Sequence, residues 1–340
     1  ATMKVLEVNG DFGLEHLTLA TRPQPEPEPG EVLLRVAGAS LNFRDLLMVR
    51  GLYNPKQPLP LIPCSDGVGE VVAIGEGVNR CRVGDRVNTL FSQSWLTGDP
   101  PPDGLRTTLG GPLDGTLAQF MVLSEQGVVA APSHLSDAEA STLTCAGLTA
   151  WSALVTRAEI GEGDTVLVLG TGGVSIFALQ FAKGLGAEVI VTSSSDAKLE
   201  RAQELGATHT LNYVETPEWG RAVRKLTDGR GVDLVVEVGG ATTLPQSVRA
   251  VRPGGQISLI GNLSGGVLDF NLIPVFMRGV RIQGILVGHR DGFEAMNRFL
   301  EQHQLRPVVD RVWPWGEARQ AFEHLAAGRH FGKVCLRIEP

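Results

Sequence analysis

A glycine-rich turn near the middle of the chain has the spacing that binds a phosphate group. Residues 165–195 read TVLVLGTGGVSIFALQFAKGLGAEVIVTSSS, which predicts a strand, a tight turn, a helix from Val174 and a second strand. Gly170 permits the sharp exit from the first strand, and Gly172 lets the backbone approach a pyrophosphate. The negative charge of that group would then lie at the N-terminus of the helix. This order predicts a dinucleotide-binding βαβ unit.

The usual fingerprint for such a turn ends in a third glycine, and this chain has a serine there. Serine is small enough for the helix to pack closely on the strand, so the surrounding pattern outweighs the missing glycine. A tight turn that binds no ligand is the structural alternative. The candidate pyrophosphate-binding residues are Gly172, Gly173, Val174 and Ser175.

The end of the second strand favours NADPH over NADH as the cofactor. NAD-specific units place an acid there to bind the ribose hydroxyls, whereas residues 192–195 of this chain read TSSS. The hydroxyls of Ser193 and Ser194 could donate to a 2′-phosphate, and the Lys198 ammonium could pair with it. Asp196 is discordant with this prediction. Alternatively, Ser194 or the serine after it simply caps the next helix.

The composition limits the class of protein. The chain has 340 residues, which is enough for about two domains, and a net charge of −7. A mildly acidic chain has little attraction for phosphate backbones, so nucleic acid is not an expected partner. We find no apolar run long enough to span a bilayer and no hydrophobic signal core near residue 1. The four cysteines are scattered, so we expect reduced thiols and a cytoplasmic enzyme without a membrane partner.

Two kinds of pattern divide the chain. Residues 1–130 contain short alternating runs between Gly and Pro, which predict a mostly β domain. Residues 131–289 alternate strand-like and helix-like segments, which predicts a parallel sheet with helices on both faces. Residues 290–340 add two helices and two strands, and we assign them to the first domain.

Ligands of open parallel sheets bind beyond the carboxyl ends of the strands. Tyr213 follows one such strand and could flank the adenine, although simple packing explains it equally well. His289 lies just after the last strand and is a weaker candidate. The other candidate cofactor-binding residues at strand ends are Val238, Gly239, Gly261, Asn262, Leu286 and Val287.

Four motifs extend this interpretation to nearly the whole chain. They are GTGGV, DLVVEVGG, RPGGQISLIG and a late GKV, and they accompany the Gly-rich β domain. With them, the chain resembles the medium-chain dehydrogenase/reductase superfamily. The resemblance implies an α/β fold, with a doubly wound Rossmann domain plus a mostly β, GroES-like catalytic domain. It also implies a homodimer paired through the last sheet strand, and cofactor contacts from Thr149, Phe331 and Lys333.

Local residues separate the zinc enzymes of this superfamily from its zinc-free reductases. The zinc enzymes carry an early Cys, a Gly-His-Glu motif and a later Cys or Asp. This chain has Asn42 at the first place, neither His nor Glu at the second (CSD, 64–66) and Cys145 at the third. One matching ligand is too few for a catalytic zinc, which takes about three protein ligands, so we expect no metal site. A site improvised from Cys64, Asp66 and Cys145 is the alternative.

The segment NFRDLLMVRGLY, residues 42–53, resembles the quinone-reductase branch. The resemblance implies that Asn42 and Tyr53 line the substrate cleft beside the nicotinamide, with Asp45 nearby. When a hydride reaches an electrophilic carbon, negative charge develops on the conjugated oxygen, and hydrogen-bond donors must stabilise it. The Asn42 amide and the Tyr53 phenol can donate, and Tyr53 or solvent could supply the proton. In the purely structural interpretation, Asn42 fixes a turn and Asp45 caps a helix.

These patterns together predict an NADPH-dependent, zinc-free oxidoreductase. Its expected partners are small-molecule quinones or α,β-unsaturated carbonyl compounds, and its expected assembly is a homodimer. An alcohol dehydrogenase or aldehyde reductase of the same superfamily is one alternative. A cofactor-binding protein with little turnover is the other.

Overall fold

The computed structural model describes residues 1–340, which form two compact units. The first unit comprises Ala1–Leu148 and Gly288–Pro340, and the second comprises Thr149–Val287. The sequence placed the first boundary earlier, at residue 131. Residues 131–148 join the first unit because the short helix α2 (Asp137–Ser141) packs on the strands β3 (Glu31–Ser40) and β4 (Asp66–Ile74).

The second unit is built on a six-stranded parallel sheet. Its strands lie in the order β10 (His209–Asn212), β9 (Glu188–Ser193), β8 (Thr165–Leu169), β11 (Val232–Glu237), β12 (Val251–Leu259) and β13 (Arg281–Gly284). In order along the chain this is 3-2-1-4-5-6, the doubly wound nucleotide-binding topology. The chain reverses its winding direction between β8 and β11, and ligands of such sheets bind at that point.

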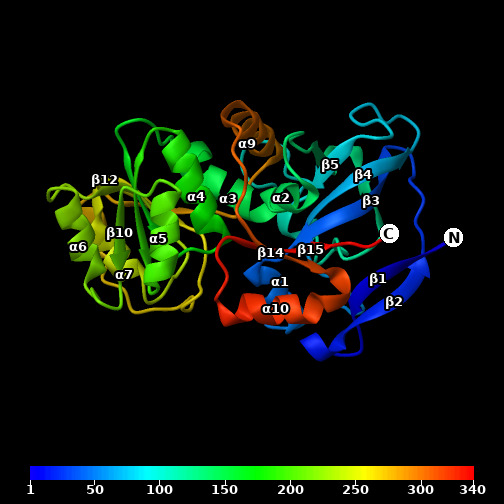
Figure 1. Cartoon of the computed structure of the whole chain (residues 1–340), viewed down its shortest axis with the longest axis horizontal. Coiled ribbons are helices and arrows are strands. Elements are labelled where there is room, and N and C mark those ends of the chain that lie inside the picture. The colour runs from blue at the N-terminus through cyan, green and yellow to red at the C-terminus, as the bar shows by residue number, and fades with distance from the viewer. The chain divides into compact units, whose positions relative to one another are not determined.

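Helices cover both faces of this sheet, as the alternating pattern predicted. Figure 1 shows α4 (Gly173–Gly184) and α5 (Asp196–Glu204) on one side, with α6 (Trp219–Leu226) and α7 (Leu244–Ala250) on the other. A short helix, α8 (Ile273–Met277), precedes the edge strand β13. The central strand β11 is buried at every residue, because a parallel strand covered on both faces has no solvent side.

The first unit contains a seven-stranded sheet. Five strands come from its N-terminal part: β3, β4, β5 (Arg86–Thr89), β6 (Phe120–Ser124) and β7 (Val128–Ala130). The C-terminal part adds β14 (Val309–Pro314) and β15 (Lys333–Arg337), and β15 pairs antiparallel with β3. A separate hairpin, β1 (Thr2–Val8) with β2 (Leu17–Pro23), was not predicted.

The helices of the first unit are α1 (Phe43–Val49), α2, α9 (Arg290–His303) and α10 (Ala318–Ala327), with four short 3-10 turns. Residues 143–156 form one helical stretch that includes α3 (Leu148–Trp151) between two π-helical segments, η4 (Leu143–Gly147) and η5 (Ser152–Thr156). Such widened turns are rare and occur frequently at functional sites. No helix of the chain is both long and apolar enough to cross a membrane.

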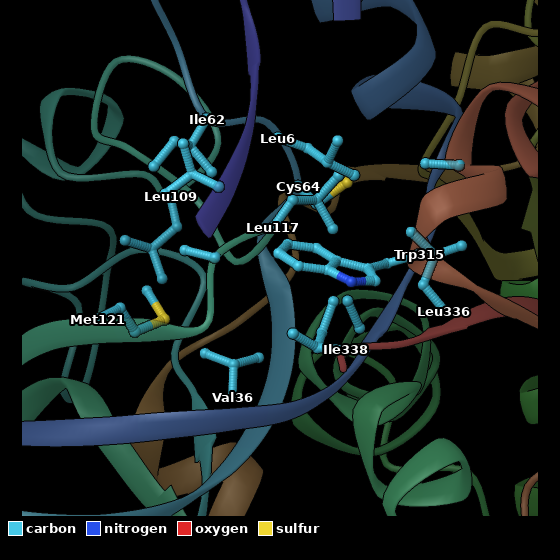
Figure 2. Close-up of a cluster of buried hydrophobic side chains, with 14 of the residues drawn as sticks. Leu6, Val36, Ile62, Cys64, Leu109, Leu117, Met121, Trp315, Leu336 and Ile338 are labelled. Atoms are coloured by element: carbon cyan, nitrogen blue, oxygen red, sulfur yellow. The ribbon is translucent and has the colours of Figure 1, made fainter. Parts of the chain in front are cut away.

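The core of the first unit joins segments that are far apart in the sequence. Figure 2 shows the Trp315 side chain among Leu6, Leu117 and Ile338, so the N-terminal hairpin, the sheet and the C-terminal segment share one core. Cys64 belongs to the same cluster and is fully buried.

Candidate active site

The predicted pyrophosphate turn has open space where a ligand would approach. Gly170 has a φ of +75°, the left-handed conformation that favours glycine, and Gly172 is the N-cap of α4 with an ordinary φ of −74°. A Cβ atom built on Gly172 would meet nothing within 4 Å. The backbone of Gly172, Gly173 and Val174 therefore begins α4 at the carboxyl end of β8, beside the reversal of the sheet. These residues fit a bound pyrophosphate.

Ser175 explains how the turn manages without its third glycine. Its hydroxyl donates a hydrogen bond to the Leu169 carbonyl at 2.7 Å, and the residue is buried. The serine thus ties the first turn of α4 to the last residue of β8. Serine in place of the third glycine therefore adds a hydrogen bond between α4 and β8, where glycine would only allow close packing.

The serine run folds into a compact turn at the carboxyl end of β9. The backbone N–H of Ser195 donates to the Ser193 hydroxyl at 3.1 Å, and Ser195 caps α5 by accepting from the backbone N–H of Lys198 at 3.3 Å. The helix-capping alternative is therefore correct for Ser195. Ser194 is exposed and is left to face solvent or a ligand.

Asp196, the acid that is discordant with NADPH, is hydrogen-bonded to a residue of the neighbouring strand β10. The Asn212 side-chain amide donates to the Asp196 carboxylate at 2.9 Å and to the Ser194 carbonyl at 3.3 Å. The backbone N–H of Tyr213 donates to the Ser193 carbonyl at 3.2 Å. The structure therefore brings Tyr213 beside the serine run, where β9 and β10 end together.

A fully buried carboxylate organises the neighbouring strand end, and sequence reasoning missed it. Glu237, the last residue of β11, accepts hydrogen bonds from the backbone N–H groups of Gly239 (2.8 Å) and Gly240 (3.2 Å). It also accepts from the hydroxyls of Thr243 and Ser247, both at 2.7 Å. Four donors on one carboxylate fix the turn that contains Val238 and Gly239. The acid within the apolar segment of DLVVEVGG was the available signal.

The predicted contacts on β12 and β13 lie in adjoining loops. A Cβ on Gly261 would come within 2.8 Å of the Val238 carbonyl oxygen, so these two candidates pack directly together. The backbone N–H of Gly265 donates to the Asn262 carbonyl at 2.8 Å, which closes a turn there. After β13, Leu286 is partly exposed, and Val287 has a φ of +50°, which is strained for a β-branched residue.

In the first unit, the structure joins two predicted residues that are 291 positions apart. The Lys333 ammonium donates to the Asn42 side-chain oxygen at 2.6 Å and to the Leu41 carbonyl at 2.7 Å. Lys333 is almost fully buried. An ammonium can only donate, so the amide oxygen of Asn42 must face it. The amide nitrogen of Asn42 is then a buried donor without a hydrogen-bond partner.

Asp45 fixes the same asparagine from the helix side. Its carboxylate accepts the backbone N–H of Asn42 at 2.8 Å, as the capping interpretation expected. Asp45 is fully buried, and this burial, with the nearby Asp66, raises its pKa to about 6; Arg44 and Lys333 oppose the shift. One carboxylate oxygen of Asp45 has no hydrogen-bond partner.

Tyr53 is linked to this group through Arg44. The Arg44 guanidinium lies 4.8 Å from the centre of the Tyr53 ring and 4.9 Å from that of Phe91. It also donates to the backbone carbonyls of Leu109 (3.1 Å) and Gly111 (2.5 Å). The Tyr53 side chain is about half exposed, with its ring against a cation.

The residues at and beside the superfamily's zinc-ligand places are engaged in other contacts. Cys64 lies in the apolar cluster around Trp315, and burial raises the pKa of its thiol well above its usual value (Figure 2). The Asp66 carboxylate accepts from the hydroxyls of Ser40 (2.8 Å) and Ser65 (2.9 Å). The Ser65 hydroxyl also lies 3.3 Å from the sulfur of Cys145.

These contacts do not fit a zinc site. A catalytic zinc takes about three protein ligands. Across residues 1–340, no group of three or more His, Cys, Asp or Glu side chains is arranged to hold a metal ion. The alternative zinc site of Cys64, Asp66 and Cys145 therefore has no geometric support.

Three further candidates have structural contacts of their own. Thr149 is buried in the helical stretch between the two π-helical segments. Phe331 is buried, and its backbone N–H donates to the Asp310 carboxylate at 3.0 Å. His289 caps α9, since its ring nitrogen accepts from the backbone N–H of Gly292 at 2.8 Å. This capping role accounts for His289 without a ligand.

Families of known proteins match both units of the structure. The family of GroES-like domains of alcohol dehydrogenases matches residues 28–133, and the family of zinc-binding dehydrogenases matches residues 173–302. The chain is 44% identical over 317 residues to a zinc-type alcohol dehydrogenase-like protein of Schizosaccharomyces pombe, covering 92% of both chains. It is 32% identical to a quinone oxidoreductase of Pseudomonas aeruginosa, again over 92% of both chains. A crystal structure of an NAD-dependent alcohol dehydrogenase matches with a TM-score of 0.91 and 36% identity, over 99% of this chain and 100% of that chain.

A doubly wound nucleotide unit joined to a GroES-like unit defines a class of oxidoreductases that use a nicotinamide cofactor. The chain belongs to the medium-chain dehydrogenase/reductase superfamily. The predicted fold class is thereby confirmed, and so is the prediction of an oxidoreductase.

Proposed function

We propose that this protein is an NADPH-dependent, zinc-free reductase of quinones or α,β-unsaturated carbonyl compounds. The observation that carries the proposal is the buried amide nitrogen of Asn42, a hydrogen-bond donor without a partner. Leaving such a donor unpaired costs about 1–3 kcal/mol, so a ligand that accepts from it would be bound more tightly. The acceptor that this chemistry needs is the oxygen on which negative charge develops.

Each residue has a definite part in the proposed reaction. Bound NADPH would supply the hydride. The Asn42 amide would donate to the substrate oxygen and stabilise its developing charge. Tyr53, held by Arg44, would cover the substrate and offer a phenol as the proton donor, with solvent as the other source.

The absence of suitable zinc ligands supports the zinc-free part of the proposal. The three side chains at the superfamily's ligand places are the Asn42 amide, the Ser65 hydroxyl, which donates to Asp66, and the buried Cys145 thiol. The amide of Asn42 is already oriented by Lys333, whose positive charge disfavours a cation nearby. Hydrogen-bond donors would therefore replace a Lewis acid at this site.

The preference for NADPH rests on the turn after β9. Ser194 is exposed there, Lys198 lies in the first turn of α5, and Asp196 is bonded to Asn212. A hydroxyl and an ammonium suit a 2′-phosphate, whereas NAD-specific units offer an acid. The NAD-dependent structure at 36% identity makes NADH the competing choice.

A nucleotide titration of metal-analysed protein tests the proposal. Three results would support it. NADPH should bind more tightly than NADH, and the protein should contain less than about 0.1 equivalent of zinc per chain. It should also reduce 1,4-benzoquinone or an enone. Stoichiometric zinc with alcohol oxidation would contradict it. That result would favour an alcohol dehydrogenase, the class named by the relative in Schizosaccharomyces pombe. NADPH binding without turnover of any acceptor would favour a binding protein.

We also propose that two copies of the chain pair through the second unit. The strand β13 is an edge of its sheet and exposes Ile282, and the preceding α8 exposes Phe276 and Met277 at 67% and 72%. An open edge with apolar neighbours favours pairing with another chain. Light scattering at micromolar concentration should give the dimer mass, and Ile282→Glu should shift it to the monomer. A monomeric wild-type protein would overturn the proposal.

A reducing compartment such as the cytoplasm fits the cysteines. All four are unpaired and buried. Disulfides are rare in reducing compartments, where scattered free thiols are ordinary.

A further inference from the structure

The Lys333–Asn42 contact follows from the pairing of β15 with β3. Cys335 lies opposite Ser40 in that antiparallel pair, and the backbone N–H of Leu41 donates to the Val334 carbonyl at 2.9 Å. Continuing that register by two residues from the Cys335–Ser40 pair places Lys333 opposite Asn42. The Lys333 ammonium therefore reaches the start of α1 from β15, a strand that is distant from α1 in the sequence.

The contact leaves the Asn42 side chain with one orientation. A freely rotating amide would present either its oxygen or its nitrogen to a ligand, and the two ends have opposite hydrogen-bonding character. The Lys333 ammonium holds the oxygen at 2.6 Å, while the Asp45 carboxylate holds the backbone N–H at 2.8 Å. Both ends of Asn42 are thus fixed, and the buried amide nitrogen is the end left for a ligand.

We propose that Lys333 is a positioning residue, which orients the Asn42 amide so that its nitrogen donates to the reacting oxygen of a carbonyl or quinone substrate. This inference rests on the proposed function. It assigns Lys333 to the substrate side of the reaction, whereas the sequence resemblance implied a contact with the cofactor. Without the ammonium, the amide is free to turn its oxygen towards the substrate oxygen, and those two acceptors repel.

A double-mutant cycle on kcat tests the inference. Asn42→Ala removes the donor and should lower kcat about 100-fold, the typical loss for one donor to a developing oxyanion. Lys333→Met should cause a similar loss. The double variant should be little worse than either single variant, because Lys333 acts through Asn42. Losses that multiply to about 10,000-fold would overturn the inference, because residues that act independently contribute additive free energies.

Two further readouts separate positioning from a structural role. The Kd for NADPH, measured by fluorescence, should stay within about threefold of wild type in Lys333→Met. A rise of tenfold or more would assign Lys333 to the nucleotide and overturn the inference. Lys333→Arg keeps a cationic donor and should recover most of the lost kcat, within about tenfold of wild type. Lys4→Met, at an exposed lysine of the same unit, is the matched control and should leave kcat unchanged.

Asn42→Asp keeps the inference testable if Lys333→Met fails to fold. Aspartate retains an acceptor for the Lys333 ammonium but has no amide nitrogen, so the variant should fold and still lose about 100-fold in kcat. Unchanged kcat in this variant would overturn the role of the donor. A wild-type protein that reduces no quinone or enone would instead contradict the proposed function itself, whereas an active wild type with independent losses would contradict only the role of Lys333.

Discussion

The Asp45 carboxylate accepts the backbone N–H of Asn42 at 2.8 Å from a position that is fully buried. Few groups stabilise the buried carboxylate in its charged form. They are the backbone N–H of Asn42 and the nearby cations Arg44 and Lys333. Burial therefore dominates, and it raises the pKa of Asp45 to about 6. The residue that fixes the start of α1 is consequently a source of pH-dependent instability.

The pH dependence of folding should reveal this group. Between the unfolded pKa of 3.8 and the folded pKa of about 6, the folded protein binds more protons at Asp45 than the unfolded chain does. The free energy of unfolding therefore falls as pH rises through that window, by up to about 3 kcal/mol. Asp45→Asn should remove the fall, because its side-chain oxygen can accept from Asn42 without a charge. Urea unfolding of both proteins from pH 4 to 7 measures the difference, and a difference independent of pH would contradict the assignment.

Gly172→Ala should separate nucleotide binding from folding. The added Cβ meets open space and the backbone φ of −74° suits alanine, so the melting temperature should stay the same or rise slightly. The methyl group would occupy the proposed pyrophosphate space, so the Kd for NADPH should rise at least about tenfold. Gly161→Ala is the matched control, because its Cβ also meets open space but it precedes β8 at the other end of the strand. Equal Kd values for the two variants would argue against a nucleotide at this turn.

The choice between NADPH and NADH should depend on Ser194. Ser194→Asp places a carboxylate at the exposed position after β9, where it would repel a 2′-phosphate and accept from ribose hydroxyls. We expect the ratio of kcat/KM for NADPH over NADH to fall by about 10- to 100-fold. Ser194→Ala, as the control, removes the hydroxyl without adding charge and should lower the ratio by less than about fivefold. A ratio that Ser194→Asp leaves unchanged would show that this turn does not contact the 2′-phosphate.

Glu237→Gln should weaken the second unit. Glutamine has the same shape, but its amide NH2 replaces an oxygen that accepts from backbone N–H or hydroxyl donors. Disrupting this buried network should cost about 2–4 kcal/mol in the free energy of unfolding. Glu188→Gln, an exposed change in the same sheet, should cost less than about 0.5 kcal/mol. Similar stabilities for the two variants would show that the four donors to Glu237 contribute little.

The nucleotide unit was predictable because its signals are local. The turn after β8, the helix that begins at Gly173 and the serine turn before α5 each depend on residues within a few positions of one another. The capping box of Ser136 and Glu139 is local in the same way, since each residue bonds the other's backbone N–H. Short-range rules of this kind can be applied to the sequence directly.

Glu237 shows where local rules stop. The sequence gives an acid at the end of an apolar strand, and such an acid could equally face solvent. Only the packing of α7 against β11 brings Ser247 to the carboxylate and makes a four-donor site. The charge is then buried because its hydrogen bonds replace those of water.

The sequence by itself determined the doubly wound unit, the glycine turn after β8 and the residue types at the zinc-ligand places, because each is a matter of spacing and identity along the chain. The tertiary structure alone decided that Lys333 meets Asn42, that Cys64 lies in the core with Trp315, and that Asp45 is fully buried. Those facts depend on the pairing of β15 with β3 and on packing between distant segments. No local pattern encodes the orientation of the Asn42 amide, since a lysine 291 residues away sets it.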